Sequence, residues 1–196
     1  MTERWPADPE HIAQTVERLR GGAAISFPTD TLYAVGCRAG DPSAVQRLYA
    51  VKRRPSNQPN ILLVKDQAQA ERSAVVDSRA ADLIARYWPG PLTLVLPAKF
   101  SLQVSETVAL RAPNHPVALA LLDQLNEPIA SSSANRAGAD SPADADAVIA
   151  GLGDDIEIVL DGGPCQIGEP STILDLSVNP PRILRQGAIP AEDLLA

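Results

Sequence analysis

Three short segments, far apart in the chain, carry side chains that could bind a small polar or anionic ligand. The first, residues 28–33 (Pro-Thr-Asp-Thr-Leu-Tyr), offers two hydroxyls, a carboxylate and a phenol. It directly follows a predicted strand, and α/β proteins place their ligands in loops at strand ends. The alternative is turn chemistry, in which Thr and Asp side chains bond their own backbone.

The second segment is the basic run Lys52-Arg53-Arg54-Pro55 at the end of a predicted helix. A cation there stabilises the helix through the macrodipole, which needs no ligand. The same residues could form an anion site, because Lys supplies a point charge and Arg a planar fork for phosphate or carboxylate oxygens. The residues alone leave both interpretations open.

The third segment, Ser-Ser-Ser-Ala-Asn at residues 131–135, is predicted to be a loop at a strand end. Its hydroxyls and amide could bind ribose, phosphate or base edges. A serine nucleophile would need a neighbouring base, but neither His11 nor His115 lies in a recognisable motif, and there is no GxSxG elbow. The sequence also lacks a Walker loop and a GxGxxG fingerprint, so a nucleotide would have to be held in another way.

The charge of the chain is acidic overall and uneven along its length. Seventeen Lys and Arg residues against 24 Asp and Glu residues give a net charge of −7, which disfavours a broad duplex-binding face. Residues 1–60 nevertheless hold 8 basic and 6 acidic side chains, whereas residues 121–175 hold 11 acidic side chains and one basic one, Arg136. The basic run at residues 52–54 therefore stands out against its background.

The two cysteines, Cys37 and Cys165, have no zinc-site spacing, and we expect both to be buried or half-buried thiols in a reducing compartment. The longest apolar run, residues 117–122, is too short to span a membrane, and the N-terminus lacks the apolar core of a secretory signal. We therefore expect a cytoplasmic protein without a membrane segment.

Strands and helices are predicted to alternate, with strands crowding near the end, which indicates an α/β domain with a mixed sheet. Predicted helices follow Asp8-Pro9, Asp41-Pro42, Ser78, His115 and Ser141-Pro142, and a last helical turn begins at Pro190. Predicted strands cover residues 23–28, 61–64, 92–96, 108–111, 128–131, 156–160, 171–176 and 182–184. No linker or internal repeat is evident, so residues 1–196 are predicted to form one domain.

Taken together, the motifs resemble those of the YrdC-like family of L-threonylcarbamoyl-AMP synthases. The resemblance covers about residues 15–190 and follows the order of the family. It is carried by residues 28–36 (PTDTLYAVG), 52–55 (KRRP), 88–93 (WPGPLT), 108–113 (VALRAP), 133–135 (SAN), 161–163 (DGG), 171–175 (STILD) and 185–187 (RQG). The chain resembles the short, single-domain form of the family.

The resemblance implies a twisted sheet of parallel and antiparallel strands, flanked by helices around a positively charged cavity. The implied reaction joins L-threonine, bicarbonate or CO2, and ATP into threonylcarbamoyl-AMP and pyrophosphate. The product serves the threonylcarbamoyl modification of the adenosine beside the anticodon in tRNAs that read ANN codons. A separate tRNA threonylcarbamoyl-transferase complex would use it, and direct tRNA contact is not supported by the net charge.

The resemblance also implies a role for individual residues, position by position. The L-threonine set is Thr31, Arg111, Ser131 and Ser171. The nucleotide set is Lys52, Arg54, Gln58, Thr107, Ser133, Asn135, Ser141 and Arg185. Lys52 and Arg54 would be the catalytic pair, and Mg²⁺ would arrive on the ATP phosphates without a protein ligand of its own.

The sequence departs from the family pattern at three places: Ala34 replaces a usual glycine, Leu63 replaces a histidine or lysine of some members, and Ser131-Ser132 replaces a commoner Ala/Thr-Pro pair. Two other functions are alternatives to this one. An RNA-binding or ribosome-associated module could use the same basic cavity, but the 4% aromatic content offers few stacking platforms. A carbamoyl transferase of hydrogenase maturation shares the fold, but it carries zinc-finger and acylphosphatase segments that this chain lacks.

Overall fold

A mixed sheet of ten strands forms the frame of the protein, in the order β1-β8-β2-β3-β7-β4-β6-β5-β9-β10. The computed structural model describes residues 2–55, 58–102 and 105–195. The strands are β1 (Glu3–Pro6), β2 (Ile25–Phe27), β3 (Ala34–Arg38), β4 (Ile61–Leu63), β5 (Leu92–Leu102), β6 (Ser105–Arg111), β7 (Ile129–Ser133), β8 (Ile158–Asp161), β9 (Thr172–Asp175) and β10 (Arg182–Arg185). Parallel and antiparallel pairs alternate irregularly, which confirms the predicted mixed α/β sheet.

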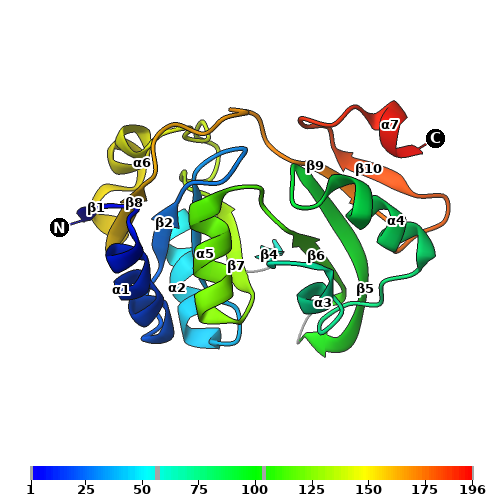
Figure 1. The fold of residues 1–196 in the computed structure, drawn as a ribbon, viewed down its shortest axis with the longest axis horizontal. Coiled ribbons are helices and arrows are strands. Elements are labelled where there is room, and N and C mark those ends of the chain that lie inside the picture. Colours follow the sequence, from blue (N-terminus) through cyan, green and yellow to red (C-terminus); the bar gives the residue numbers. More distant parts are fainter. Residues whose placement is uncertain (1, 56–57, 103–104, 196) are drawn as a thin grey trace.

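The helices cover this sheet in groups that each bury an apolar core. They are α1 (Pro9–Arg20), α2 (Pro42–Lys52), α3 (Gln67–Ala70), α4 (Ser78–Tyr87), α5 (Pro116–Leu125), α6 (Ala145–Leu152) and α7 (Ala191–Leu195), with a 3-10 turn at Gly153–Asp155. One core joins α1 and α5, a second joins α2 and α6, and a third joins α4 and α7 to β5, β6 and β9. In Figure 1, α1 and α5 lie in front of the half of the sheet that contains β1, β8, β2, β3 and β7, and α4 lies in front of the other half. No helix in the described ranges has the length and apolar character needed to cross a bilayer.

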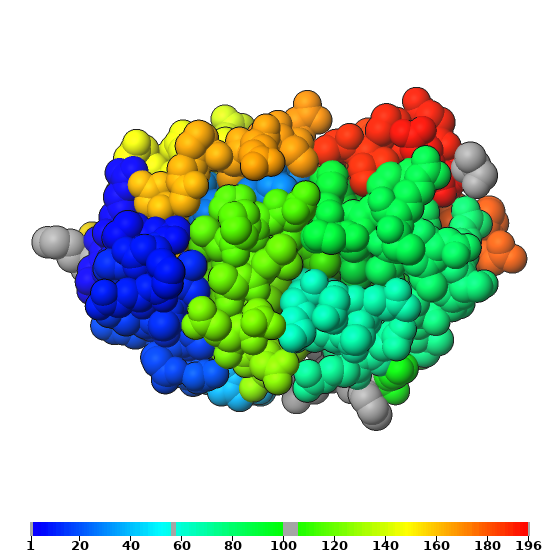
Figure 2. Space-filling view, in the orientation of Figure 1, coloured from blue at the N-terminus to red at the C-terminus, as the bar shows by residue number. Residues whose placement is uncertain are grey.

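A long connection between β8 and β9, residues 162–171, crosses the molecule and closes over the loop 28–33. Its backbone donates hydrogen bonds from Ile167 N to Asp30 O and from Gly168 N to Thr31 O, each at 3.0 Å. Figure 1 shows this connection running along one edge, and in Figure 2 it forms the orange surface beside the green surface of α5. We call it the strap, because it ties the two halves of the sheet together across one loop.

The helix starts agree with the sequence where an Asp side chain is available as a cap. Asp8 accepts from His11 N, and Asp41 accepts from Ser43 N, as the Asp-Pro pairs predict. Ser78 was expected to cap α4, but Asp77 is the cap and Ser78 is the first helical residue. An ionised carboxylate is a stronger acceptor than a hydroxyl at a helix N-terminus, which explains the shift by one residue.

Two other expectations are wrong. The predicted helix at Ser141-Pro142 begins instead at Ala145 with Asp144 as its cap, because tertiary contacts hold the preceding residues outside the helix: Pro142 O accepts from Tyr33 N at 2.9 Å. The serine run was predicted to be a loop, but residues 131–133 belong to β7, where Ser133 pairs with Ala34. Strands β1 and β3 and the short helix α3 were not predicted at all.

Candidate functional site

A cavity of about 210 Å³ lies where the strap, the loop 28–33 and strands β4, β7 and β9 meet. Its described lining includes three arginines, Arg54, Arg111 and Arg185, and no Asp or Glu side chain. Hydroxyls line the remaining polar wall, and Leu63 and Ile173 line the apolar wall. The arrangement is suited to an anionic ligand that also carries a small apolar group.

Thr29 organises the loop 28–33 by local bonds. Its hydroxyl donates to Leu32 O at 2.7 Å and accepts from the backbone N–H of Thr31 and of Leu32. The loop therefore has the self-bonded turn that was the alternative interpretation of its sequence. It also faces the cavity, since Thr29, Thr31 and Leu32 all belong to the lining.

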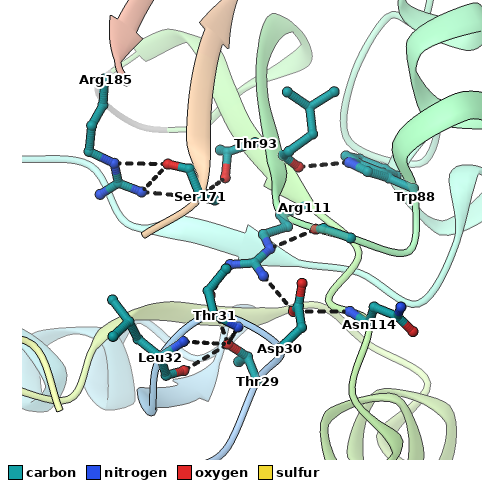
Figure 3. A network of polar contacts seen from close by, with 12 residues as sticks. Thr29, Asp30, Thr31, Leu32, Trp88, Thr93, Arg111, Asn114, Ser171 and Arg185 are labelled. Atoms are coloured by element: carbon teal, nitrogen blue, oxygen red, sulfur yellow. Dashed lines mark hydrogen bonds and ion pairs between the residues drawn. The ribbon is translucent and has the colours of Figure 1, made fainter. Parts of the chain in front are cut away.

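Arg111 is the most enclosed of the three cavity arginines, with 5% of its surface exposed. Its Nε donates to Gly90 O at 3.0 Å, and its Nη1 donates to Thr31 Oγ1 at 2.8 Å (Figure 3). Its Nη2 donates to the Asp30 carboxylate. A guanidinium has five N–H groups, so two of those of Arg111 donate to no acceptor among the described residues. Burial lowers the pKa of Arg111 and Asp30 counteracts that effect, while the guanidinium stays charged at neutral pH.

The turn after α4 holds the Nε side of Arg111 in place. Gly90 N donates to Ala112 O at 2.8 Å, so the turn is tied to the residue that follows Arg111. A Cβ at Gly90 would lie 2.4 Å from Tyr87 O, which only glycine avoids. The Trp-Pro-Gly-Pro segment thus acts as a rigid platform behind the arginine.

Arg185 reaches the cavity because of an irregularity in the last strand. Ile183 pairs with Leu174, but Arg185 pairs with the next residue, Ile173, so Leu184 is an extra residue in β10. Side chains alternate along a strand, and one inserted residue moves the following side chain to the other face. Leu174 belongs to the apolar core whereas Ile173 lines the cavity, so the bulge carries Arg185 from the core face to the cavity face.

Ser171, at the end of the strap, is the partner that fixes Arg185. The Nε and Nη2 groups of Arg185 donate to Ser171 O at 3.0 and 2.9 Å, and Nη2 also contacts Ser171 Oγ at 3.0 Å (Figure 3). The Ser171 hydroxyl in turn lies 2.8 Å from Thr93 Oγ1. Burial lowers the pKa of Arg185, and no described carboxylate lies within ion-pair distance of it.

Lys52 lies behind the cavity wall rather than on it. Its ammonium donates to Ser133 O and to Asn135 Oδ1, the latter at 3.2 Å. Asn135 also accepts from Ser133 Oγ and donates to Ala139 O at 2.6 Å, so the three residues form one network. Burial, together with the charge of Arg54, lowers the pKa of Lys52 to about 8.

Arg54 is separated from Lys52 by one residue in left-handed backbone, Arg53 at φ 48°. It lines the cavity, and its Nη1 donates to Ser132 Oγ at 3.3 Å. Its Nη2 donates to Gln58 O at 3.1 Å, and its guanidinium lies over the Tyr49 ring, 5.3 Å from the centroid. These contacts hold the guanidinium near the serine run of β7.

The structure brings most of the predicted site residues to one place. Eight line the cavity: Thr31, Arg54, Arg111, Ser131, Ser133, Ser141, Ser171 and Arg185. Lys52 and Asn135 stand directly behind it. Gln58 is exposed and takes part through its backbone carbonyl, while Thr107 lies on β6, four residues before Arg111 and outside the lining.

Four residues of the site were not among those assigned to the threonine or nucleotide sets from the sequence. Asp30 and Gly90 hold Arg111, Thr93 contacts Ser171, and Ser132 contacts Arg54. All four lie inside segments that the sequence analysis identified, residues 28–33, 88–93 and 131–135, so their position within those segments was the available signal. Both apolar departures from the family pattern, Ala34 and Leu63, line the cavity.

Comparison with known proteins gives consistent matches over nearly the whole chain. The family model Sua5_yciO_yrdC, described as "Telomere recombination", matches residues 17–187. A Bacillus subtilis protein named threonylcarbamoyl-AMP synthase is 39% identical over 203 residues, covering 100% of this chain and 59% of that protein. The uncharacterized protein YciO of Escherichia coli K12 is 30% identical over 192 residues and is covered to 92%.

Among solved structures, Sua5 of P. abyssi complexed with L-threonine superposes with a TM-score of 0.91 at 37% identity, covering 99% of this chain and 59% of that one. This chain therefore spans about three fifths of the length of the Bacillus and P. abyssi proteins that it matches. The range that the family model matches, residues 17–187, includes every residue that lines the cavity of this chain.

Proposed function

The chain belongs to the Sua5/YciO/YrdC family, and from this premise we propose that it is a threonylcarbamoyl-AMP synthase. The reaction would join L-threonine, bicarbonate or CO2, and MgATP into threonylcarbamoyl-AMP and pyrophosphate. The observation that carries the proposal is the convergence of Arg54, Arg111 and Arg185 with serine and threonine hydroxyls on one cavity without an acidic wall. The name of the Bacillus relative and the L-threonine bound to the P. abyssi relative support it.

The proposed threonine site is the enclosed end of the cavity around Arg111. Two free N–H groups of its guanidinium would take the carboxylate in a fork, a geometry that Lys cannot supply. Thr31, Ser131 and Ser171 add hydroxyls around this point, and Leu63 offers an apolar surface for the methyl group. The site would thus accept a small amino acid with a short side chain.

The proposed nucleotide site is the end of the cavity near Arg54 and Arg185, with Lys52, Ser133 and Asn135 behind it. Its positive charges have no carboxylate partner within ion-pair distance in the described chain. A triphosphate would supply the missing negative charge. Gln58, Thr107 and Ser141 are the outer contacts that the family resemblance adds to this site.

The proposed chemistry forms and breaks bonds without a covalent enzyme intermediate. The threonine amine adds to CO2, giving a carbamate and releasing one proton. A carbamate oxygen then forms a bond to the α-phosphorus of ATP, and the bond from that phosphorus to the bridging oxygen breaks, so pyrophosphate leaves in line. The step gathers several negative charges, and the fixed charges of Lys52, Arg54 and Arg185 would stabilise that accumulation.

The described residues offer no group of three His, Cys, Asp or Glu side chains able to hold a metal ion. The cavity lining is also free of carboxylates over the described ranges. These residues therefore do not fit a resident metal site, and we treat Mg²⁺ as part of the MgATP substrate. In the cell we expect a cytoplasmic setting and a tRNA threonylcarbamoyl-transferase complex as the consumer of the product.

The direct test is mass spectrometry of the product formed from MgATP, L-threonine and ¹³C-bicarbonate. We expect threonylcarbamoyl-AMP that carries the label, together with pyrophosphate in equal amount. Arg54→Ala should slow pyrophosphate release about 30- to 1000-fold, the usual effect of losing one preorganised donor. The matched control is Arg53→Asn, which removes a neighbouring exposed charge and tolerates left-handed backbone. Product without threonine dependence, or an equal loss in both variants, would refute the proposal.

A further inference from the structure

The positive side chains around the cavity differ in whether a carboxylate pairs with them. Arg111 forms a buried ion pair with Asp30, and the side chains of the two residues are 7% and 4% exposed. Lys52, Arg54 and Arg185 have no Asp or Glu within ion-pair distance among the residues that the structure describes. One end of the cavity is therefore close to neutral, whereas the other end carries three uncompensated charges.

Asp30 acts from behind the cavity wall. Its Oδ1 accepts from Arg111 Nη2 and from the backbone N–H of Asn114 at 3.1 Å (Figure 3). Its backbone carbonyl accepts from Ile167 of the strap. The side chain is not among the residues that line the cavity, so it would touch Arg111 and not the ligand.

The second carboxylate oxygen shows what an acid contributes at this position. Asp30 Oδ2 is buried and has no hydrogen-bond partner in the described chain. An amide could accept the same two bonds through its single oxygen. What a carboxylate adds over an amide here is its negative charge, which faces Arg111.

That charge matters because Arg111 and Arg185 line the same cavity. Without Asp30, Arg111 would add a further uncompensated charge to the cavity, at the end where Thr31 lies. A polyphosphate would then be attracted to the end that the proposed function assigns to the amino acid. A zwitterionic amino acid has no net charge, so it gains little from the same change.

We propose that Asp30 is a specificity-determining positioning residue, which keeps polyphosphate out of the amino-acid end of the cavity by neutralising Arg111. This inference rests on the proposed function for the identity of the two ligands. At about 6 Å in a water-like dielectric, one unit charge changes the affinity for a unit anion about threefold. Pyrophosphate carries about two more charges than a carboxylate, so losing Asp30 should shift selectivity toward pyrophosphate about tenfold or more.

The test uses Asp30→Asn, which keeps the shape and the accepting oxygen. In the wild type, inorganic pyrophosphate should not compete with threonine at concentrations at which, in Asp30→Asn, it competes and raises the threonine KM; the pyrophosphate inhibition constant against threonine should be about tenfold lower in Asp30→Asn than in the wild type. Asp30→Glu, which keeps the charge, should resemble the wild type in this respect. The matched control is Asp123→Asn, which removes the same charge from an exposed pair with Lys65. A pyrophosphate response that is equal in all four proteins would overturn the inference.

Calorimetry measures how many pyrophosphate sites the protein has, so it tests the inference without a catalytic assay. Its wild-type titration does not depend on whether the variant folds. Titration of wild-type protein with pyrophosphate should give one site per chain, and threonine should still bind to the pyrophosphate-loaded protein. Asp30→Asn should show a second, weaker pyrophosphate site. A second pyrophosphate site in the wild type, or displacement of threonine from the wild type by pyrophosphate, would overturn the role proposed for Asp30. Failure of the wild type to form product contradicts the proposed function instead and leaves the pyrophosphate count as the deciding measurement here.

Discussion

Arg111→Lys tests the assignment of the amino-acid end most sharply, because it preserves the charge and removes the fork. Three of the five N–H groups of Arg111 donate to Gly90, Thr31 and Asp30, which leaves two for the carboxylate of the proposed ligand. A lysine ammonium can keep the ion pair with Asp30, so the fold should survive. It cannot also present two parallel N–H groups to a ligand.

The expected size of the effect follows from the loss of one charge-assisted hydrogen bond. Such a bond contributes about 1.5–3 kcal/mol, which corresponds to a threonine KM raised about 10- to 150-fold. The KM for ATP should change little, because the proposed nucleotide end lies around Arg54 and Arg185. Steady-state pyrophosphate release, with each substrate varied in turn, measures both constants.

The control for this substitution is Arg182→Lys. Arg182 also pairs with an aspartate, Asp175, at 3.2 Å, but its side chain is 64% exposed and it is not part of the cavity lining. It should leave both KM values unchanged. If Arg111→Lys raises the two KM values equally, or raises neither, the carboxylate assignment is wrong.

Three further predictions concern pH and stability. Burial and the charge of Arg54 lower the pKa of Lys52 to about 8, so its ammonium loses its charge as pH rises through 8. We expect kcat/KM for ATP to fall above that pH, and Lys52→Arg should abolish the fall. Gly36→Ala should lower the unfolding free energy by about 1–3 kcal/mol in urea titrations, because a Cβ would lie 2.6 Å from Ile129 Cγ2. His115 caps α5 through Nδ1, which requires a neutral ring, and burial lowers its pKa in the folded state. Its contribution should be present above pH 6.5 and lost as pH falls below it, and His115→Asn, which keeps a cap, should flatten urea midpoints measured from pH 5 to 8.

Local signals in the sequence were sufficient for most helices and for the uniformly apolar strands. The Asp-Pro pairs predicted the starts of α1 and α2, because proline fixes the first helical φ and the carboxylate accepts a free N–H. The apolar run at residues 61–64 predicted a strand, and β4 forms there between β6 and β7. Its predicted cover on both faces is incomplete, because Ile61 and Leu63 line the cavity. These features depend only on residues adjacent in the chain.

Features that depend on distant partners could not be predicted in this way. Strand β3 (Ala-Val-Gly-Cys-Arg) has little intrinsic strand character, and it forms because β2 and β7 pair with it on both sides. The bulge at Leu184 is visible only once β10 is paired with β9. The same holds for the site: the motifs contain Arg111, Arg185 and the residues that hold them, but only the fold shows which residue contacts which.

Burying cationic side chains around the cavity is energetically unfavourable, and this desolvation explains how the site is arranged. Burial lowers the pKa of Lys52, Arg111 and Arg185, which means that the folded protein holds each charge less favourably than water does. Of these three, only Arg111 has a carboxylate within ion-pair distance among the residues that the structure describes. The other two are held by neutral acceptors, the carbonyls of Ser133 and Ser171, which satisfy their N–H groups without cancelling their charge. An anionic ligand stabilises these buried charges when it binds, so the charges that destabilise the protein without a ligand favour the binding of phosphate. They do so in a chain whose net charge of −7 would otherwise repel an anion.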